Sequence, residues 1–331
     1  MSETQDLLSR LETNVKVNSL NAWILAARPK TLTGASVPIM IGIAFAFIDI
    51  GWIHFQVVPA ILCIFFAFIM QIDANFVNDY FDFRKGNDNE KRLGPKRACA
   101  QGWITARAMQ WGIGVTLLLA ALVGLGILAV FLTVSQHSLL SLTLGLGLVG
   151  LSCGAGAFLY TTHLSRLALG DVMVLIFFGL VPVGGTYFLL TDHLTVAAVL
   201  LGVAIGLVVD LLLVVNNFRD RENDARVQKR TLVVLLGESK TNGFYMLLGV
   251  AAMLALFGVC ATLPATEDIL LMQFLPALEA LIFFPLHWRT WKALQRIRHG
   301  RALNALLGET SRNILVFAFA FCLGLLLQNI W

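Results

Sequence analysis

Residues 195–224 read TVAAVLLGVAIGLVVDLLLVVNNFRDREND, and this stretch decides the fold. Its first part, residues 195–215, is apolar except for Thr195 and Asp210, and a cluster of amide, acidic and basic side chains follows it. An apolar run of about 18 or more residues is typical of a helix that crosses a membrane. The stretch therefore predicts a transmembrane helix that ends in a polar cluster.

Similar apolar runs extend over most of the chain. Of its 331 residues, 58% are hydrophobic and only 13% are charged, which is too apolar for a soluble domain of this size. We predict nine spans, at about residues 32–49, 55–78, 109–132, 139–160, 170–190, 195–218, 243–263, 269–286 and 313–330. The expected fold class is all-α, a polytopic membrane protein with a cytoplasmic or interfacial segment at residues 1–31 and a transmembrane domain at residues 32–331.

The positive charges indicate how this domain lies in the membrane. In the nine-span arrangement all 24 Lys and Arg fall on one side, with 4 before the first span and 7, 1, 6 and 6 in the successive loops of that side. Because basic loops stay in the cytoplasm, we expect a multi-pass protein of the cell inner (plasma) membrane with its N-terminus inside and its C-terminus outside. The net charge of +4 at pH 7 reflects this topology, so no nucleic acid is expected as a partner.

Two acidic clusters lie at the cytoplasmic ends of the second and sixth predicted spans. The first reads Asn78-Asp79-Tyr80-Phe81-Asp82, with Asp88 beyond it, and the second reads Asn216-Asn217-Phe218-Arg219-Asp220, with Asp224 beyond it. The two clusters are 138 positions apart, and at this offset Asn78 and Asp82 align with Asn216 and Asp220. Because carboxylates that border a membrane are costly to bury, the duplication indicates a shared function.

Carboxylate and amide side chains four residues apart on a helix suggest a magnesium site. Residues four apart on a helix share a face, and Mg²⁺ binds through one or two carboxylates while water and substrate phosphates complete its ligands. Two like charges ~4 Å apart repel by roughly 4 kcal/mol at an effective dielectric constant of about 20, so gathered carboxylates need cations. The predicted metal ligands, which would hold two Mg²⁺ ions bridged by a diphosphate, are Asn78, Asp82, Asp88, Asn216, Asp220 and Asp224.

Basic residues follow both clusters and fit a diphosphate ligand. Arg side chains match phosphate oxygens with two parallel hydrogen bonds, and Lys adds a point charge. The candidates are Arg84, Lys85, Lys96 and Arg97 after the first cluster, and Arg219 and Lys229 after the second. Ordinary cytoplasmic loops also carry such charges, and a divalent-cation transporter would use the same acidic residues, so both alternatives stay open at this point.

The two clusters resemble the aspartate-rich motifs of the UbiA-type intramembrane prenyltransferases. The matching residues are Asn78-Asp79-x-x-Asp82 and Asp220-x-x-x-Asp224, with Ala27-Arg28-Pro29-Lys30-Thr31-Leu32 matching at the start of the first span. The resemblance covers nearly the whole chain and implies nine helices, with the motifs on the second and the sixth. It also implies Mg²⁺ as cofactor, a polyprenyl diphosphate as substrate, and a bundle open toward membrane lipid, where the long tail lies.

Within this family the sequence resembles the branch that acts on 1,4-dihydroxy-2-naphthoate in menaquinone synthesis. The stretches that carry this are Leu93-Gly94-Pro95-Lys96-Arg97 and Asn216-Asn217-Phe218-Arg219-Asp220. The resemblance implies transfer of a polyprenyl group to this acceptor with loss of CO₂ and diphosphate, which gives a demethylmenaquinone. Another aromatic acceptor such as 4-hydroxybenzoate is the alternative within the family.

The resemblance also assigns roles to single residues. It implies catalytic roles for Asp79, Asp82, Asp220 and Asp224, and substrate contacts for Arg28, Lys30, Tyr160 and Asn217 in addition to the basic residues above. The sequence departs from the family pattern at Asp88, which stands two positions late, and in the short loop that follows Tyr160. Asp73, Asp210 and Glu279 lie deeper in the predicted spans, where they either face a cavity or pack as neutral carboxylates.

Overall fold

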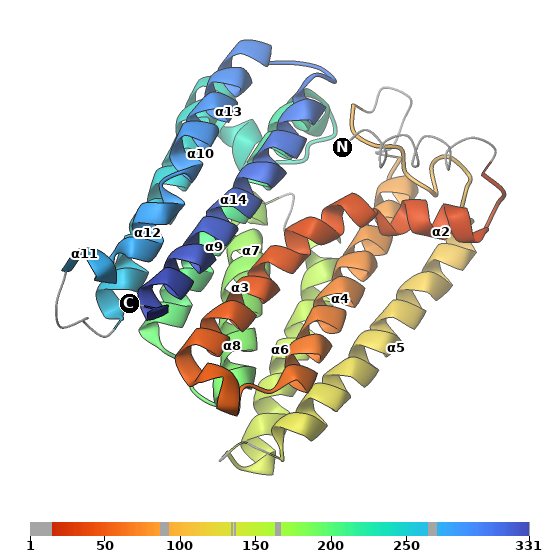
Figure 1. The fold of residues 1–331 in the computed structure, drawn as a ribbon. Coiled ribbons are helices and arrows are strands. Elements are labelled where there is room, and N and C mark those ends of the chain that lie inside the picture. The colour runs from red at the N-terminus through yellow and green to blue at the C-terminus, as the bar shows by residue number, and fades with distance from the viewer. Residues whose placement is uncertain are drawn as a thin grey trace.

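The computed structural model describes residues 15–86, 93–133, 135, 137–162, 167–263 and 270–330. These residues form a bundle of long helices (Figure 1). The helices are α2 (Leu20–Ala27), α3 (Pro29–His54), α4 (Val57–Arg84), α5 (Ala106–Phe131), α6 (Leu139–Thr162), α7 (Gly170–Leu175), the π-helix η2 (Ile176–Leu180), α8 (Val181–Thr191), α9 (Val196–Arg226), α10 (Leu232–Thr262), α11 (Leu270–Gln273), α12 (Leu275–Ala280), α13 (Phe283–Ile297) and α14 (Leu303–Ile330).

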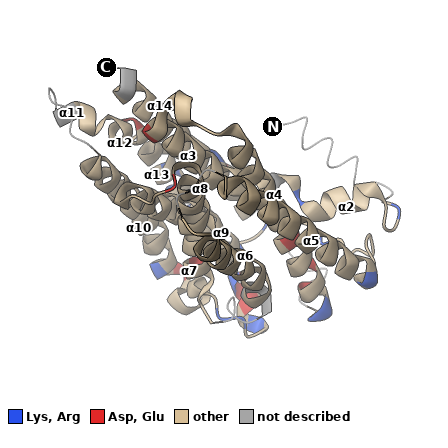
Figure 2. Ribbon diagram, turned by 90° about the horizontal axis from the view of Figure 1, so that it is seen from below, with Lys and Arg blue, Asp and Glu red and all other residues tan. Residues whose placement is uncertain are grey.

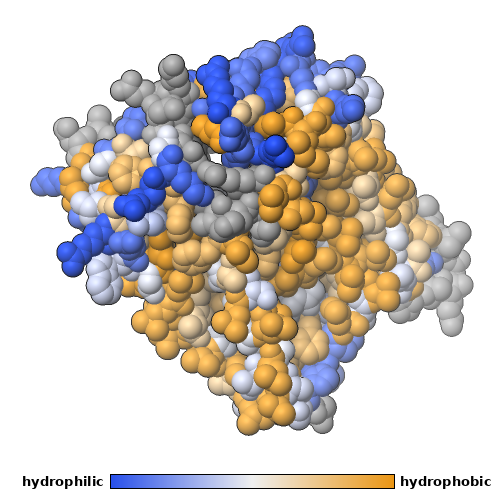
Figure 3. Space-filling model, turned by 180° about the vertical axis from the view of Figure 1, so that it is seen from behind, coloured by the Kyte–Doolittle hydropathy of each residue, from blue (hydrophilic) through white to orange (hydrophobic). Residues whose placement is uncertain are grey.

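The predicted all-α membrane fold is confirmed. Within the described ranges, eight helices or helix successions are long and apolar enough to cross a membrane. The long helices are tan over most of their length in Figure 2, where blue and red segments mark the charged residues. Figure 3 shows a broad hydrophobic surface below a hydrophilic end of the molecule, as expected for a bundle surrounded by lipid.

The eighth predicted span, residues 269–286, is the one that differs from the expectation. The structure divides this region into α11, α12 and α13. Pro276 stands in the first turn of α12, where it lacks the N–H that would continue a preceding helix. α13 is amphipathic, and it buries Phe283, His287, Thr290 and Leu294 while Arg289 is exposed. Broken helices of this kind are tolerated where neighbouring helices cover them, and here α12 and α13 contact both α10 and α14.

The central helix is α9, which contacts α3, α7, α8, α10 and α14. Thr195 caps its first turn by accepting a hydrogen bond from the backbone N–H of Ala198. Its small residues allow η2 to approach closely, because a Cβ atom on Gly179 would lie 2.4 Å from the carbonyl oxygen of Gly202 and 2.7 Å from Cα of Gly206. Glycine is therefore what allows the backbones of η2 and α9 to pack closely at this contact.

Both motif-bearing helices extend beyond their apolar runs. α4 continues to Arg84 and α9 continues to Arg226, so each acidic cluster is helical. α14 begins near the same end of the bundle and ends at the opposite one (Figure 1). Residues that are far apart in the sequence therefore meet at this end.

Candidate active site

A cavity of about 2840 Å³ lies inside the bundle. Helices α3, α4, α5, α6, α8, α9 and α14 contribute to its walls, and apolar side chains form most of its lining. Its polar end, which we call the mouth, is lined by Asn78, Lys96, Arg97, Asn216, Arg219 and Asn304. Residues from both acidic motifs therefore border one cavity.

The first motif lies in the last turns of α4, and its two aspartates have different surroundings. Asp79 is fully buried, and its carboxylate accepts hydrogen bonds from the backbone N–H groups of Ala98 at 2.8 Å and Cys99 at 2.9 Å. Asp82 accepts a hydrogen bond from Nη2 of Arg97 at 3.2 Å, and its side chain is 25% exposed. The loop after α4 therefore uses both oxygens of Asp79, whereas Asp82 contacts Arg97, which lines the mouth.

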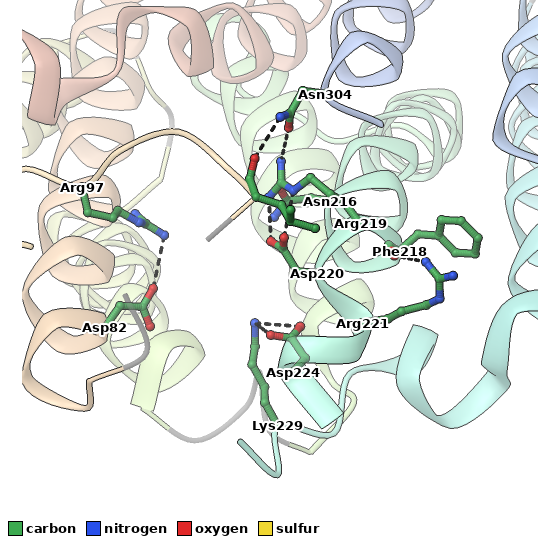
Figure 4. Close-up of polar contacts among 11 residues, drawn as sticks. Asp82, Arg97, Asn216, Phe218, Arg219, Asp220, Arg221, Asp224, Lys229 and Asn304 are labelled. Carbon is green, nitrogen blue, oxygen red and sulfur yellow. Dashed lines mark hydrogen bonds and ion pairs between the residues drawn. The ribbon is translucent and has the colours of Figure 1, made fainter. Parts of the chain in front are cut away.

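The second motif is organised around one buried guanidinium. The side chain of Arg219 is 1% exposed and forms a two-point ion pair with Asp220, at 2.8 Å from Nε and 2.6 Å from Nη2. Nη2 also donates to Oδ1 of Asn216 at 2.6 Å, and Nη1 donates to Oδ1 of Asn304 at 2.8 Å (Figure 4). Four hydrogen bonds therefore hold Arg219 inside the protein.

One turn further along α9, Asp224 pairs with Lys229, whose Nζ lies 3.3 Å from Oδ2. Asp224 also interacts electrostatically with Asp220 and with Asp82 of the first motif. In Figure 4 the Asp82–Arg97 pair and the Asp224–Lys229 pair lie on opposite sides of the same open space. The tertiary structure thus brings the two motifs together, as their duplication predicts.

The donor chemistry at the mouth fits a hard divalent cation. Asp82, Asp220 and Asp224 supply carboxylate oxygens and Asn78 and Asn216 supply amide oxygens, which are the ligand types that Mg²⁺ prefers. Within the described part of the chain, however, no three Asp, Glu, His or Cys side chains converge closely enough to hold a metal. Instead, each of the three carboxylates is paired with a basic side chain of the protein itself. The side chains of Asp82 and Asp220 remain 25% and 22% exposed, so a cation can reach them.

The remaining predicted substrate-binding residues are divided between the mouth and other places. Arg28 lines the cavity at the corner between α2 and α3, where its φ of 51° is left-handed, and its Nη2 lies 3.9 Å from Asp79. Lys96 also lines the cavity. Arg84 and Lys85 are exposed at the end of α4, and Asn217 is buried on α9. Asp88 and the side chains of Lys30 and Tyr160 lie outside the described structure.

The deeper acidic residues have partners of their own. Asp73 accepts a hydrogen bond of 2.6 Å from Oγ1 of Thr116 on α5. Asp210 on α9 lies close to Asp171 at the start of α7. Glu279 is half-buried on α12.

Two residues at the mouth were not identified from the sequence. Asn75 donates from its side-chain amide to the carbonyl oxygen of Ala27 and to Oγ1 of Thr31, both at 2.9 Å, and so holds the corner that carries Arg28. Asn304 on α14 joins Arg219 to the loop after α4. Asn75 stands only three residues before Asn78, so proximity to the motif was a usable signal, whereas nothing in the sequence around Asn304 marks it.

The protein is a bundle of membrane-spanning helices around a largely apolar cavity with a charged mouth. Such a cavity suits a ligand with a charged head and an apolar body. The chain belongs to the UbiA prenyltransferase family, whose sequence pattern matches residues 35–299. The family resemblance inferred from the motifs is therefore confirmed.

Relatives and solved structures agree with this assignment. The 1,4-dihydroxy-2-naphthoate octaprenyltransferase of Haemophilus influenzae is 32% identical over 315 residues, covering 93% of this chain and 96% of that protein. The Escherichia coli protein of the same name is 33% identical over 323 residues, covering 96% and 99%. A UbiA homologue from Aeropyrum pernix superposes with a TM-score of 0.61 at 17% identity, covering 90% of this chain and 98% of that one.

A UbiA homologue from Archaeoglobus fulgidus, whose structure holds GPP and Mg²⁺, superposes with a TM-score of 0.59 at 12% identity. It covers 91% of this chain and 99% of that one. At this level of identity the superposition supports the fold, which is that of an integral-membrane prenyltransferase.

Proposed function

We propose that this protein transfers a polyprenyl group from a polyprenyl diphosphate to 1,4-dihydroxy-2-naphthoate. Carbon dioxide and diphosphate are lost, and the product is a demethylmenaquinol, the reduced form of a demethylmenaquinone of menaquinone biosynthesis. One structural observation carries the prenyl-transfer part: two acidic motifs from distant helices meet at the charged mouth of a long apolar cavity. The choice of acceptor rests on the naphthoate-specific relatives that match this chain over nearly its whole length.

The cavity suits the donor substrate. Its volume of about 2840 Å³ is larger than the roughly 300–1,000 Å³ typical of small-molecule pockets. Apolar side chains such as Phe66, Leu128 and Phe177 line it below the mouth. An isoprenoid tail would lie along these side chains and extend into membrane lipid, while its diphosphate stays at the mouth.

Two kinds of charged group would receive the diphosphate. Asp82, Asp220 and Asp224, with Asn78 and Asn216, would hold Mg²⁺, which supplies positive charge that offsets the charge of the leaving diphosphate. Asp88 is a further candidate ligand. Arg28, Lys96 and Arg97 line the cavity and would donate charge-assisted hydrogen bonds to phosphate oxygens. Lys229, which pairs with Asp224, is a further candidate.

The chemistry needs negative charge to be stabilised as it develops on the leaving group. The allylic C–O bond breaks with its electron pair going to the diphosphate, and the electron-rich ring carbon forms the new C–C bond before its carboxylate leaves as CO₂. Fixed cations at the mouth favour this bond cleavage because they are in place before charge develops. The apolar lining excludes water, which would otherwise trap the reactive allylic group.

Asp79 has a different task in this proposal. Asp79 is fully buried and both of its oxygens accept from backbone N–H groups, so it would orient the loop that carries Lys96 and Arg97. Asp220, which is also held at both oxygens, keeps 22% exposure and stays a candidate metal ligand. Arg219 similarly braces Asn216 and Asp220. In this proposal Asp79 and Arg219 act indirectly, by holding other residues of the site. This replaces the catalytic role predicted for Asp79 and the substrate contact predicted for Arg219.

The mouth would open toward the cytoplasm of a cell with this protein in its inner membrane. The loops near the mouth carry Lys and Arg, and basic loops stay on the cytoplasmic side. A diphosphate and an aromatic acid made in the cytoplasm would then reach the site without crossing the membrane.

The test is product identity. Purified protein is incubated with a labelled polyprenyl diphosphate, Mg²⁺ and either 1,4-dihydroxy-2-naphthoate or 4-hydroxybenzoate. The mass of the lipid product is then measured by mass spectrometry. A prenylated naphthalenediol, or the naphthoquinone that air oxidation makes from it, together with release of CO₂ supports the proposal. A prenylated benzoate that keeps its carboxyl group refutes the acceptor, and no lipid product together with Mg²⁺ flux into vesicles favours the cation transporter.

A further inference from the structure

One segment bridges the mouth between the two halves of the site. Residues 93–101 follow the first motif helix, and Leu93, Gly94, Lys96 and Arg97 all line the cavity. This segment carries Lys96 and Arg97, and Arg97 pairs with Asp82 of the first motif. How it is held therefore decides where their charges are placed.

Asp79 on α4 anchors the later part of the segment. The backbone N–H groups of Ala98 and Cys99 donate to its two carboxylate oxygens at 2.8 and 2.9 Å. Both residues are buried, with Ala98 at 2% and Cys99 at 4% exposure. Arg97 then reaches Asp82, three residues further along α4, at 3.2 Å.

Asn304 on α14 anchors the earlier part of the segment. Its side-chain N–H donates to the carbonyl oxygen of Leu93 at 2.9 Å, and its side-chain oxygen accepts from Nη1 of Arg219 at 2.8 Å. The amide is used at both ends, so neither a carboxylate nor an aliphatic side chain reproduces both contacts. Gly94 packs directly against the guanidinium of Arg219, because a Cβ atom on Gly94 would be 2.8 Å from Nη2 of Arg219.

We propose that Asn304 is a positioning residue of the prenyl-transfer reaction. Together with Asp79 it clamps residues 93–101 at two points, and this holds Lys96 and Arg97 at the mouth for the diphosphate. The role in turnover rests on the proposed function, whereas the clamp itself is a property of the substrate-free protein. Asn304 thereby links α14, which carries no acidic motif, to both motifs of the site.

The clamp predicts how kinetic constants respond. Loss of Asn304 leaves the metal-binding carboxylates in place but frees the segment that carries Lys96 and Arg97. The KM for polyprenyl diphosphate should rise roughly tenfold, the change expected for one lost hydrogen bond to a charged group. The KM for the aromatic acceptor should stay within about twofold of wild type, because the apolar walls are unchanged.

A second readout needs no substrate. Cys99 is buried while the segment is held at both points. Once the Asn304 anchor is lost, Asp79 alone holds the segment, so its contacts with Ala98 and Cys99 should open more often. Alkylation of Cys99 by N-ethylmaleimide reports this opening, and it is measured peptide by peptide with mass spectrometry on the full-length protein in detergent. Asn304→Ala and Asn304→Asp are compared with wild type. Asn21→Ala serves as the matched control, because Asn21 is an exposed residue of α2.

The expected result is alkylation of Cys99 at least several-fold faster in both Asn304 variants, with the Asn21 variant unchanged. Asn304→Asp should respond although it keeps an acceptor for Arg219, because it cannot donate to Leu93. If Asn304→Ala fails to fold, Gly94→Ala tests the same contact from the loop side. Unchanged Cys99 alkylation in the folded variants overturns the clamp, and a loss of kcat at constant KM for the diphosphate overturns the positioning role. Faster alkylation in a protein that forms no naphthoquinone leaves the clamp standing and rejects the proposed function instead.

Discussion

Replacing Asp220 by asparagine should damage both folding and turnover, whereas the sequence alone predicts only the second effect. The difference comes from Arg219, whose side chain is 1% exposed and bonded to both oxygens of Asp220. Asp220→Asn removes the negative charge and leaves the guanidinium buried without its counter-ion. Asn216 and Asn304 still accept hydrogen bonds from it, but neither carries charge.

The size of the effect follows from this geometry. Breaking a buried ion pair by removing one partner costs about 3–5 kcal/mol, because the other charge stays uncompensated. Asp82→Asn offers the comparison, since Asp82 accepts a hydrogen bond from one nitrogen of Arg97 at 3.2 Å and its side chain is 25% exposed. There the loss should be about 1–2 kcal/mol, near that of a hydrogen bond to a charged group. The two asparagine variants should therefore differ in stability by roughly 2–3 kcal/mol, although both lose a proposed metal ligand.

The assay is equilibrium unfolding in mixed micelles of a mild detergent and SDS, followed by tryptophan fluorescence, with turnover measured on the same samples. The double variant Arg219→Gln with Asp220→Asn supplies the control, because it removes both charges and leaves two amides that can bond to each other. It should recover most of the lost stability and none of the activity. Equal unfolding midpoints for Asp220→Asn and Asp82→Asn, or a double variant no more stable than Asp220→Asn, would show that Arg219 does not depend on this pairing.

Further predictions address the metal, the packing and the topology. Asp82→Asn should lower turnover at least about 100-fold, a loss of roughly 2.7 kcal/mol in transition-state stabilisation, while the free energy of unfolding falls by only about 1–2 kcal/mol; normal activity would remove Asp82 from the site. EDTA should abolish turnover and added Mg²⁺ should restore it, and activity that survives complete chelation would refute the metal requirement. Gly179→Ala should destabilise the protein by about 1–3 kcal/mol, because the new methyl group would meet Gly202 at 2.4 Å; Gly147→Ala, where no neighbour lies within 4 Å, should be neutral or slightly stabilising. A reporter at the C-terminus should be active only outside the cytoplasm, and activity inside would mean an even number of crossings.

Local patterns were sufficient for most of the fold. Apolar runs predict spans because the membrane interior leaves a backbone no alternative to helical hydrogen bonds. The expected spans at 55–78 and 195–218 begin within two residues of the starts of α4 and α9, and the repeated clusters at their ends do meet at one cavity. The exception is the region 269–286, where Pro276 and the amphipathic α13 replace one straight span. Pro276 was visible in the sequence, but only the packing between α10 and α14 makes a broken helix acceptable there.

The sequence by itself determined that this chain is a helical membrane protein with two acidic motifs on one side, because composition and spacing along a helix are local properties. Only the tertiary structure decided which partner each acid takes. Asp79 and Asp82 are three positions apart in one motif, yet one is buried against a loop and the other faces the mouth. Arg219 is bonded to Asn304, 85 positions away, and Asn304 in turn to Leu93, 211 positions away. Such contacts depend on how whole helices pack, and a single sequence records no distance between residues on different helices.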